Sequence, residues 1–329
     1  MIKEISLNEL ATNLKEIKYT LILCHKNPDP DTLGSAFALK EILKHLGSNV
    51  EVACADAPPS KFGFITGGES LEYQEKSYER YIAIDVASPM QLGDLSYLSD
   101  KVDFTIDHHR MCTRFSKYYA DFRASCAEIV FLLASELNIL DDLPIQFYNC
   151  LYAGMSADTG GFRYSNVTPE TMSLASEVIK RGIDHAEINR IIFDSKSLEE
   201  IKAQKLTYEK MQLFYDGSLS LIMFTNEMKE ANKITDADIG DIVNTVRSVE
   251  GVLVAISLKQ QRDETKFSLS SRANAEIDVS KVCAGFGGGG HTRAAGATVV
   301  ANSPEEAVEI VVSEFGNAIE EYKKGLKNG

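Results

Sequence analysis

Short apolar runs alternate with amphipathic stretches along the first half of the chain. The apolar runs predict buried β-strands at residues 20–24, 50–53, 81–86 and 104–106. Apolar positions spaced three and four apart predict helices at residues 33–46, 126–137, 145–155 and 169–182. Strands that alternate with helices are typical of an α/β fold with a mostly parallel sheet and helices on both faces. Ligands of such sheets bind at the carboxyl ends of the strands, so we look there for function first.

The second half divides into a helical stretch and a new mixed region. Residues 184–214 are polar, rich in Glu and Lys and free of Pro and Gly, which favours helices. A second set of elements follows, with strands at residues 219–224, 252–258 and 266–270, a helix around 238–249 and a long helix that Ser303 and Pro304 open. Because 329 residues exceed the usual size of one hydrophobic core, we predict a first domain at 1–183, a helical linker at 184–216 and a smaller α/β domain at 217–329.

The composition is that of a globular protein with an acidic balance of charge. Hydrophobic residues make up 44% of the chain, and 34 Lys and Arg against 48 Asp and Glu leave a net charge of −14. Such a charge disfavours binding along long nucleic acids, which needs many contacts between basic side chains and phosphates. A small anionic substrate is compatible with it, because bound metal ions and a few Arg residues can reverse the field inside a cleft.

The expected compartment is the cytoplasm, with no membrane partner. The N-terminus lacks the apolar core of a signal peptide, and no apolar run approaches the roughly 20 residues that span a bilayer. The six cysteines are scattered without a C-x-x-C pair and lie mostly in apolar runs, which favours buried reduced thiols.

The segment after the first predicted strand carries three candidate metal ligands, His25, Asp29 and Asp31. Pro28 and Pro30 predict an extended loop here in place of a helix, because Pro removes a backbone donor and biases the residue before it away from helical angles. Two carboxylates in one loop cavity repel each other unless a cation or a shared proton neutralises them. A divalent metal ion meets this requirement.

Three more groups of His and Asp follow apolar elements. Asp85 ends the third predicted strand, Asp107, His108 and His109 follow the fourth, and Asp158 ends a predicted helix. Carboxylate and imidazole ligands suit manganese and similar divalent ions, and a carboxylate that bridges two ions about 3.5–4 Å apart is typical of two-metal hydrolases. One such residue alone is more often a turn residue or a helix cap. Four groups at the ends of elements of one sheet together favour a shared metal site.

A glycine-rich segment, GFGGGGHTRAAG at residues 285–296, lies in the second predicted domain. Glycine runs are often flexible linkers. Here His291 and Arg293 follow the glycines, and glycines let backbone N–H groups approach an anion closely. We therefore favour anion binding over a linker, with a helix N-terminus after the glycines to hold phosphate.

Together these motifs resemble those of the DHH-family phosphoesterases. HKNPDPDTLGSA, AIDVAS, DHH and ADTGGF match the family's four ordered motifs, and GFGGGGHTRAAGA is similar to the glycine-rich motif of its DHH-associated C-terminal domain. In length and layout the chain most resembles the nanoRNase/pAp phosphatase group, whose members are bifunctional oligoribonucleases and PAP phosphatases. The resemblance implies hydrolysis of short oligoribonucleotides or of 3′-phosphoadenosine 5′-phosphate by hydroxide that two metal ions activate.

The resemblance also implies roles for the candidate residues. Two divalent ions, Mn²⁺ with Mg²⁺ as an alternative, would be bound by His25 and Asp29 for the first, by Asp31, His108 and Asp158 for the second, and by Asp85 as a bridge. His109 would contact the scissile phosphate. Asp107 would hydrogen-bond a His that binds a metal ion and so fix the orientation of its ring, without contacting the ion itself. Further residues would bind the substrate's other phosphate or its terminal nucleotide: Arg272, Gly288, Gly289, Gly290 and His291. A homodimer is also implied.

The first motif departs from the family's common form at two positions. Pro30 and Thr32 stand where Gly and Ala are common, and neither change removes a ligand.

Other functions fit parts of the sequence. Within the family, the main alternative is hydrolysis of a cyclic dinucleotide such as cyclic di-AMP, or of linear pApA, although the sensory and transmembrane segments of its membrane-bound members are not found in this sequence. A manganese pyrophosphatase would share the first domain, but the GGGGH motif resembles a nucleotide-handling second domain. Digestion of long single-stranded DNA is disfavoured by the charge of −14. A non-catalytic nucleotide-binding module would tolerate a broken ligand set, and this set is complete.

Overall fold

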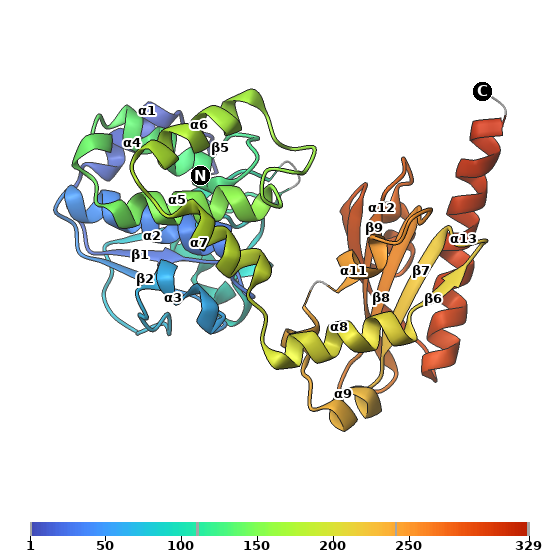
Figure 1. Cartoon of the computed structure of the whole chain (residues 1–329). Helices are drawn as coiled ribbons and strands as arrows, with labels where there is room; N and C mark the ends of the chain where they lie inside the picture. Colours follow the sequence, from blue (N-terminus) through green and yellow to red (C-terminus); the bar gives the residue numbers. More distant parts are fainter. Residues whose placement is uncertain (1, 110–111, 241, 328–329) are drawn as a thin grey trace. The chain divides into compact units, whose positions relative to one another are not determined.

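The structure of the chain, a computed structural model, describes residues 2–109, 112–240 and 242–327. The chain divides into two units, Met1–Ser195 and Lys196–Gly329. Figure 1 shows both units and labels many of their helices and strands. Within the described residues, no helix has both the length and the apolar character that crossing a bilayer requires.

The first unit is built on a five-stranded parallel sheet with the order β2-β1-β3-β4-β5. Its strands are β1 (Thr20–Leu23), β2 (Val50–Ala53), β3 (Arg80–Ile84), β4 (Phe104–Asp107) and β5 (Lys117–Ala120). β1 has β2 on one side and β3 on the other, so the strand order reverses between β1 and β3, the usual place for a ligand in such sheets. The four predicted strands are confirmed. β5 was not predicted, because its half-buried and exposed side chains form no apolar run.

Side chains of β1 alternate between the two faces of the sheet. Ile22 points to a core formed with the helices α2 (Pro30–His45), α4 (Cys126–Glu136) and α5 (Ile145–Asp158). Leu21 and Leu23 point to the opposite face, which the 3₁₀ segment η2 (Pro89–Lys101) covers. Gly93, with a φ of 60°, interrupts that segment, so a kinked 3₁₀ layer stands where an α-helical one was expected.

The remaining elements of the first unit complete its edges and connections. They are α1 (Leu7–Leu14), η1 (Ser60–Phe62), α3 (Gly63–Thr66), η3 (Leu140–Asp142), α6 (Pro169–Lys180), α7 (His185–Asn189) and η4 (Arg190–Asp194). The four helices predicted for the first half are confirmed as α2, α4, α5 and α6.

The second unit contains a six-stranded mixed sheet with the order β10-β11-β9-β8-β7-β6. β7 and β8 are parallel neighbours, and the other four pairs are antiparallel. The strands are β6 (Gln212–Phe214), β7 (Leu219–Phe224), β8 (Val254–Gln260), β9 (Lys266–Ala273), β10 (Gly289–His291) and β11 (Ala294–Val300). One face packs on α12 (Val279–Gly285) and α13 (Pro304–Lys327), and the other on α8 (Leu198–Lys210), α10 (Asp236–Ile239) and α11 (Val243–Arg247), while α9 (Asn226–Asn232) follows β7.

Two predictions for this unit are wrong. The helix expected around residues 238–249 is two short helices, because Gly240, at φ 49° and ψ −134°, ends the first of them. The glycine run leads into β10 and β11 in place of a helix N-terminus. A Cβ at Gly290 would lie 2.5 Å from the carbonyl oxygen of Ala294, so glycine here permits close pairing of β10 with β11.

Candidate metal centre

The carboxyl ends of β1 and β3 bring His25 and Asp85 together. His25 lies two residues after β1, Asp85 directly follows β3, and His25 Nε2 is 3.5 Å from Asp85 Oδ2. Asp85 is 3% exposed and has a φ of 57°. This left-handed conformation is uncommon for a residue with a Cβ, and such strain concentrates at functional sites. A buried carboxylate on a residue with a strained backbone, at the end of a strand, therefore marks this position as a candidate for function.

Asp29 and Asp31 begin helix α2. Asp29 is the N-cap, and its Oδ1 accepts hydrogen bonds from the N–H groups of Asp31 and Thr32 at 2.9 and 3.0 Å. The extended loop expected at Pro30 is wrong, because Pro is favoured at the first helical position, where an N–H would have no partner within the helix. The second oxygen of Asp29, Oδ2, lies 3.6 Å from His25 Nε2.

The N-terminus of α4 holds the fully buried carboxylate of Asp31. Its Oδ2 accepts a hydrogen bond from the N–H of Cys126 at 2.7 Å, and its Oδ1 accepts one from Ala127 at 3.0 Å. Gly154 of α5 makes room for it, since a Cβ there would lie 2.5 Å from Asp31 Oδ1. The packing of α2, α4 and α5 thus fixes this carboxylate beside the other candidate ligands.

His108 follows β4 and faces three carboxylates. Its Nδ1 lies 3.2 Å from the carbonyl oxygen of Arg123, a contact that orients the ring and directs Nε2 the opposite way. Nε2 lies 3.3 Å from Asp158 Oδ2, 3.4 Å from Asp85 Oδ1 and 3.9 Å from Asp31 Oδ2. Asp158 is the last residue of α5.

The six predicted ligands form two sets. Within each set the ligand atoms lie within 4.8 Å of one another, and the sets are His25, Asp29 and Asp85, and Asp31, His108 and Asp158. Asp85 faces both, because its Oδ2 lies beside His25 and its Oδ1 beside His108. Among the described residues, Asp85 Oδ1 is buried and accepts no hydrogen bond, a costly state unless a cation binds it. The carboxylate and imidazole donors and this buried oxygen fit a pair of divalent ions.

Burial and mutual charge set the protonation of the metal-free cluster. Burial lowers the pKa of His25, but the facing carboxylates of Asp29 and Asp85 raise it by more, to about 11. The pKa of His108 is raised to about 11 in the same way, with burial opposed mainly by Asp85. Burial, and after it the charge of Asp85, raises the pKa of Asp31 to about 7. The cluster therefore holds protons that a divalent cation displaces when it binds.

A buried carboxylate behind His109 holds that side chain. Asp107 Oδ1 lies 2.7 Å from His109 Nδ1, and Asp107 Oδ2 accepts a hydrogen bond from Arg114 Nη1 at 2.8 Å. Asp107 was expected to orient a ligating His, but its partner is His109, whereas His108 is oriented by a backbone carbonyl. Nothing in the sequence singles out Arg114, which lies seven residues after Asp107.

The predicted substrate-binding residues lie in the second unit. Arg272 of β9 and His291 of β10 both pair with Ala294 of β11. Residues in register on neighbouring strands share a face of the sheet, so Arg272 and His291 lie on one face about two strand spacings, roughly 10 Å, apart. Gly288 is required by packing, since a Cβ there would lie 2.2 Å from a backbone carbonyl oxygen, whereas a Cβ at Gly289 would meet nothing within 4 Å.

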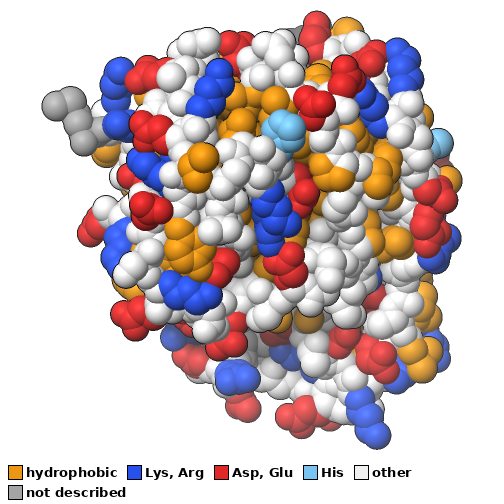
Figure 2. Space-filling model, turned by 90° about the vertical axis from the view of Figure 1, so that its left-hand side faces the viewer, with side chains coloured by type: hydrophobic (Ala, Val, Ile, Leu, Met, Phe, Trp, Pro, Cys, Tyr) orange, Lys and Arg blue, Asp and Glu red, His pale blue; other side chains and the backbone are white. Residues whose placement is uncertain are grey.

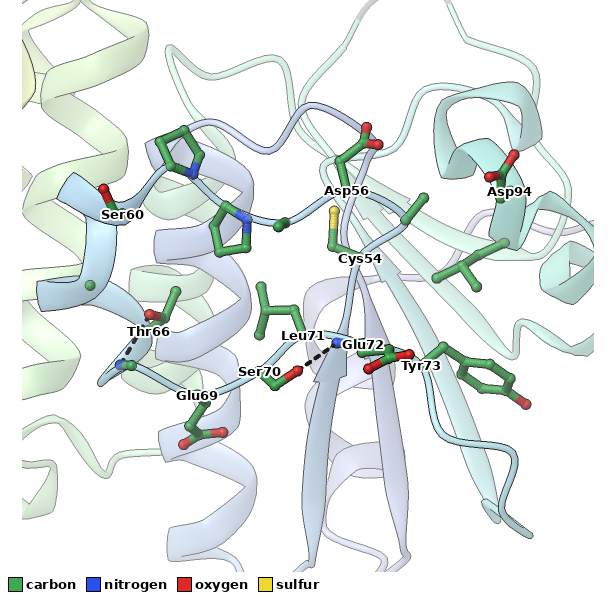
Figure 3. A pocket seen from close by; sticks show the side chains of 17 residues that line it. Cys54, Asp56, Ser60, Thr66, Glu69, Ser70, Leu71, Glu72, Tyr73 and Asp94 are labelled. Atoms are coloured by element: carbon green, nitrogen blue, oxygen red, sulfur yellow. Dashed lines mark hydrogen bonds between the residues drawn. The ribbon is translucent and has the colours of Figure 1, made fainter. Parts of the chain in front are cut away.

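A pocket of about 830 Å³ lies beside the loop that carries His25 (Figure 3). Asp56, which lines it, accepts a hydrogen bond from the N–H of Asn27 at 2.8 Å. The carboxylates around the pocket belong to Asp56, Glu69, Glu72 and Asp94. Their negative charge disfavours a phosphate-containing ligand. The metal centre, and not this pocket, is therefore the candidate site for chemistry on an anion.

Comparison with known proteins gives two matching family models and several similar proteins. The DHH family, N-terminal domain, matches residues 19–155, and the DHHA1 domain matches residues 222–321. A protein of Streptococcus mutans named "Probable bifunctional oligoribonuclease and PAP phosphatase NrnA" is 30% identical over 294 residues, which cover 87% of this chain and 92% of that protein. The bifunctional oligoribonuclease and PAP phosphatase NrnA of Thermus thermophilus is 29% identical, over 88% of this chain and 87% of that protein.

Solved structures are similar in fold. An exopolyphosphatase-related protein from Bacteroides fragilis matches with a TM-score of 0.87 at 25% identity, over 98% of this chain and 97% of that chain. RecJ from Thermus thermophilus, in complex with Mn²⁺, matches with a TM-score of 0.54 at 16% identity, over 96% of this chain and 54% of that chain. The likeness to RecJ shows a shared fold alone.

Proposed function

This chain belongs to the DHH family of phosphoesterases, and we propose that it hydrolyses short oligoribonucleotides (nanoRNA) and 3′-phosphoadenosine 5′-phosphate. The observation that carries the proposal is the position of Asp85, whose two carboxylate oxygens face different histidines, His25 and His108. A bridged pair of divalent ions requires a carboxylate in such a position. The substrate class comes from the relatives, which are named bifunctional oligoribonuclease and PAP phosphatase.

In this proposal two divalent ions, Mn²⁺, would be held by two sets of residues, His25 with Asp29 and Asp31 with His108 and Asp158, and Asp85 would contribute to both. When bound, they supply hydroxide near neutral pH and screen the negative charge of the phosphate. The protein keeps the ligands in place: the carbonyl of Arg123 orients His108, and the α4 N-terminus fixes the carboxylate of Asp31.

His109 is the residue that donates a hydrogen bond to the scissile phosphate. Its Nδ1 lies 2.7 Å from Asp107 Oδ1 and 3.6 Å from Asp85 Oδ1, and in this proposal Nε2 is the atom that contacts the substrate. Burial lowers the pKa of His109, but Asp107, followed by Asp85, raises it by more, which favours the protonated ring that can donate this hydrogen bond. Arg114 keeps Asp107 in place through its hydrogen bond to Oδ2.

Two features support a preference for small substrates. The net charge is −14, and on the face in Figure 2 acidic and basic side chains are intermingled, an arrangement that disfavours tracking along a long nucleic acid. Arg272 and His291, on one face of the second sheet, form a short row suited to one further phosphate or a terminal nucleotide. In this proposal residues 1–183 are catalytic, residues 184–216 connect, and residues 217–329 bind the substrate.

The family resemblance also supports two proposals about the protein in the cell. The first is that it works in the cytoplasm, which fractionation of cells and detection with an antibody would test. The second is that it is a homodimer, which light scattering coupled to size-exclusion chromatography would test.

A substrate panel with Mn²⁺-loaded protein tests the proposed function. RNAs of dinucleotide to pentanucleotide length and 3′-phosphoadenosine 5′-phosphate should be hydrolysed, and EDTA should abolish the reaction. Hydrolysis of neither, by protein with bound metal, would contradict the proposal. Faster hydrolysis of cyclic di-AMP than of the RNAs and 3′-phosphoadenosine 5′-phosphate would reassign the substrate.

A further inference from the structure

Tyr164 presents a fixed aromatic ring close to one of the candidate metal ligands. The side chain is 45% exposed. Its ring packs over Gly160, where a Cβ would lie 2.3 Å from the ring carbon Cζ. Gly160 lies two residues after Asp158, so their Cα atoms are at most about 7.6 Å apart. One side of the ring thus rests on the backbone beside a ligand, and part of its surface is open to solvent.

Thr159 makes several of the hydrogen bonds that hold the turn carrying the ring. Thr159 Oγ1 donates a hydrogen bond to the carbonyl of Met155 at 2.6 Å and accepts one from the N–H of Phe162 at 2.9 Å. The Thr159 carbonyl accepts hydrogen bonds from the N–H groups of Arg163 and Tyr164 at 2.9 and 3.0 Å. Phe162 has a φ of 63°, which a bulky residue adopts only where its surroundings impose it. The ring therefore lies on a turn whose conformation is fixed by hydrogen bonds.

Asn166 ties this turn to the backbone of Asp158 and to the segment that contains Arg123 and Ala124. Its Nδ2 donates hydrogen bonds to the carbonyl oxygens of Asp158 and Ala124, each at 3.1 Å. Ala124 follows Arg123, whose own carbonyl faces His108 Nδ1. Hydrogen bonds to the backbone thus link the turn that carries Tyr164 to Asp158 and, through the neighbouring Arg123, to the segment that orients His108.

We propose that the exposed surface of Tyr164 is the platform on which the nucleobase next to the scissile phosphate stacks. This base-binding subsite of the first unit rests on the proposed function and makes it more specific. Stacking on an aromatic side chain tolerates any base, because every base has a π face. The preceding residue, Arg163, donates a hydrogen bond from Nε to the Gly160 carbonyl at 2.5 Å, and its guanidinium lies 5.8 Å from the centre of the Phe193 ring, so the same turn carries a positive charge. A flat, partly exposed ring on a turn that also carries a cation fits a nucleotide better than it fits a phosphate chain without bases.

The experiment compares an adenine dinucleotide with the same dinucleotide built from abasic riboses. Tyr164→Ala should raise KM for the adenine dinucleotide about 10-fold and leave KM for the abasic one unchanged. Tyr164→Phe keeps the ring and should retain the wild-type KM. As a matched control, Tyr97→Ala removes a tyrosine of η2 that is 62% exposed and should change neither constant. No effect of Tyr164→Ala, or equal effects on both dinucleotides, would overturn the inference.

A binding measurement separates this inference from the proposed function. Wild-type protein that hydrolyses neither the dinucleotides nor 3′-phosphoadenosine 5′-phosphate contradicts the proposed function. Stacking is measured without turnover as quenching of 2-aminopurine fluorescence when a dinucleotide with that base binds. Loss of the quench in Tyr164→Ala, but not in Tyr97→Ala, supports the platform, and an undiminished quench in Tyr164→Ala contradicts it. Equal melting temperatures of the variants show that differences in binding do not arise from differences in folding stability.

Discussion

The carboxylate of Asp85 is buried, lies between two histidines and belongs to a residue with a left-handed backbone. Asp85→Asn keeps the volume of the side chain and removes the charge that faces both ligand sets. We expect kcat to fall about 10³-fold, in line with the loss of one preorganised electrostatic group, and Mn²⁺ binding to weaken. Steady-state kinetics and calorimetric titration with Mn²⁺ measure the two effects.

The control for this change is Asp94→Asn, which removes an exposed carboxylate from the pocket of Figure 3. Both constants should stay at wild-type values in that variant. An Asp85→Asn protein with nearly wild-type kcat and Mn²⁺ affinity would show that Asp85 bridges no ions.

Arg114 is a positioning residue, because it acts on His109 only through Asp107. Arg114→Ala removes the hydrogen-bond donor to Asp107 Oδ2 and loosens the orientation of His109. We therefore expect kcat to fall about 10-fold, which is typical for the loss of a residue that holds a functional side chain in place. If the contact of His109 strengthens in the transition state, kcat and kcat/KM fall together. Arg114→Lys keeps a donor without the planar fork and should recover part of the loss. A change in KM alone, at constant kcat, would contradict the positioning role.

Whether the sequence identifies a residue depends on how local its chemistry is. The six candidate ligands are His and Asp at the ends of predicted elements, so the amino-acid sequence alone shows their residue type and their place. Arg114 and Asn166 are ordinary loop residues, and their importance comes from contacts that the folded chain makes, with Asp107 seven residues away and with the Ala124 carbonyl 42 residues away. No local pattern encodes such contacts, which is why the sequence did not predict either residue.

At the scale of elements, helices α2 and α5 approach each other at two glycines. A Cβ at Gly34 would lie 2.3 Å from the carbonyl oxygen of Cys150, and one at Gly154 would lie 2.5 Å from Asp31 Oδ1. A backbone carbonyl and a buried, hydrogen-bonded carboxylate cannot move aside cheaply. The close approach is what allows Asp31, in the first turn of α2, to share a ligand set with Asp158 at the end of α5.

Gly154→Ala should therefore destabilise the protein, although replacing Gly by Ala within a helix usually stabilises it. In an ordinary helix, Ala in place of Gly is more stable by about 0.5–1 kcal/mol. Here the added methyl overpacks the contact with Asp31, so we expect a loss of roughly 2 kcal/mol and weaker Mn²⁺ binding. Thermal unfolding with and without Mn²⁺ measures both.

Gly325→Ala in α13 is the matched control, because a Cβ there meets nothing within 4 Å. Its stability should be unchanged or higher by up to about 1 kcal/mol. A Gly154→Ala protein that behaves like this control would argue against the close packing of α2 on α5.

Element prediction worked where one signal dominates and failed where a signal has two meanings. Buried runs followed by amphipathic stretches predicted the strands and helices of the first sheet. Pro30 favours a loop by its missing donor, but the cap that Asp29 provides makes it the first helical residue. The glycines before His291 suggested a loop at a helix N-terminus, but two of them, Gly288 and Gly290, are required by the close approach of β11. The first outcome was decided by the residue directly before Pro30, and the second by the pairing of two strands.

At the scale of the whole molecule, the six candidate ligands all belong to Met1–Ser195, whereas Arg272 and His291 belong to Lys196–Gly329. A ligand that binds only the folded state stabilises it by about 2.7 kcal/mol when present at 100 times its Kd. If the ligands are those proposed, this stabilisation acts on the unit that contains them. The division of the chain thus turns the ligand assignment into a prediction about regional stability.

Removing Mn²⁺ with EDTA should speed amide exchange in peptides from β1, β3 and the start of α2, and leave peptides from β7, β8 and β9 unchanged. Hydrogen exchange followed by mass spectrometry measures this directly. Because Mn²⁺ displaces protons from the cluster, including that of Asp31 with its pKa of about 7, the protection by metal should increase as the pH rises from about 6 to about 8. The sign follows from competition, since protons occupy the ligands at lower pH and leave them as the pH rises. Equal protection of both units by Mn²⁺, or protection that decreases over this pH range, would contradict a metal centre confined to the first unit.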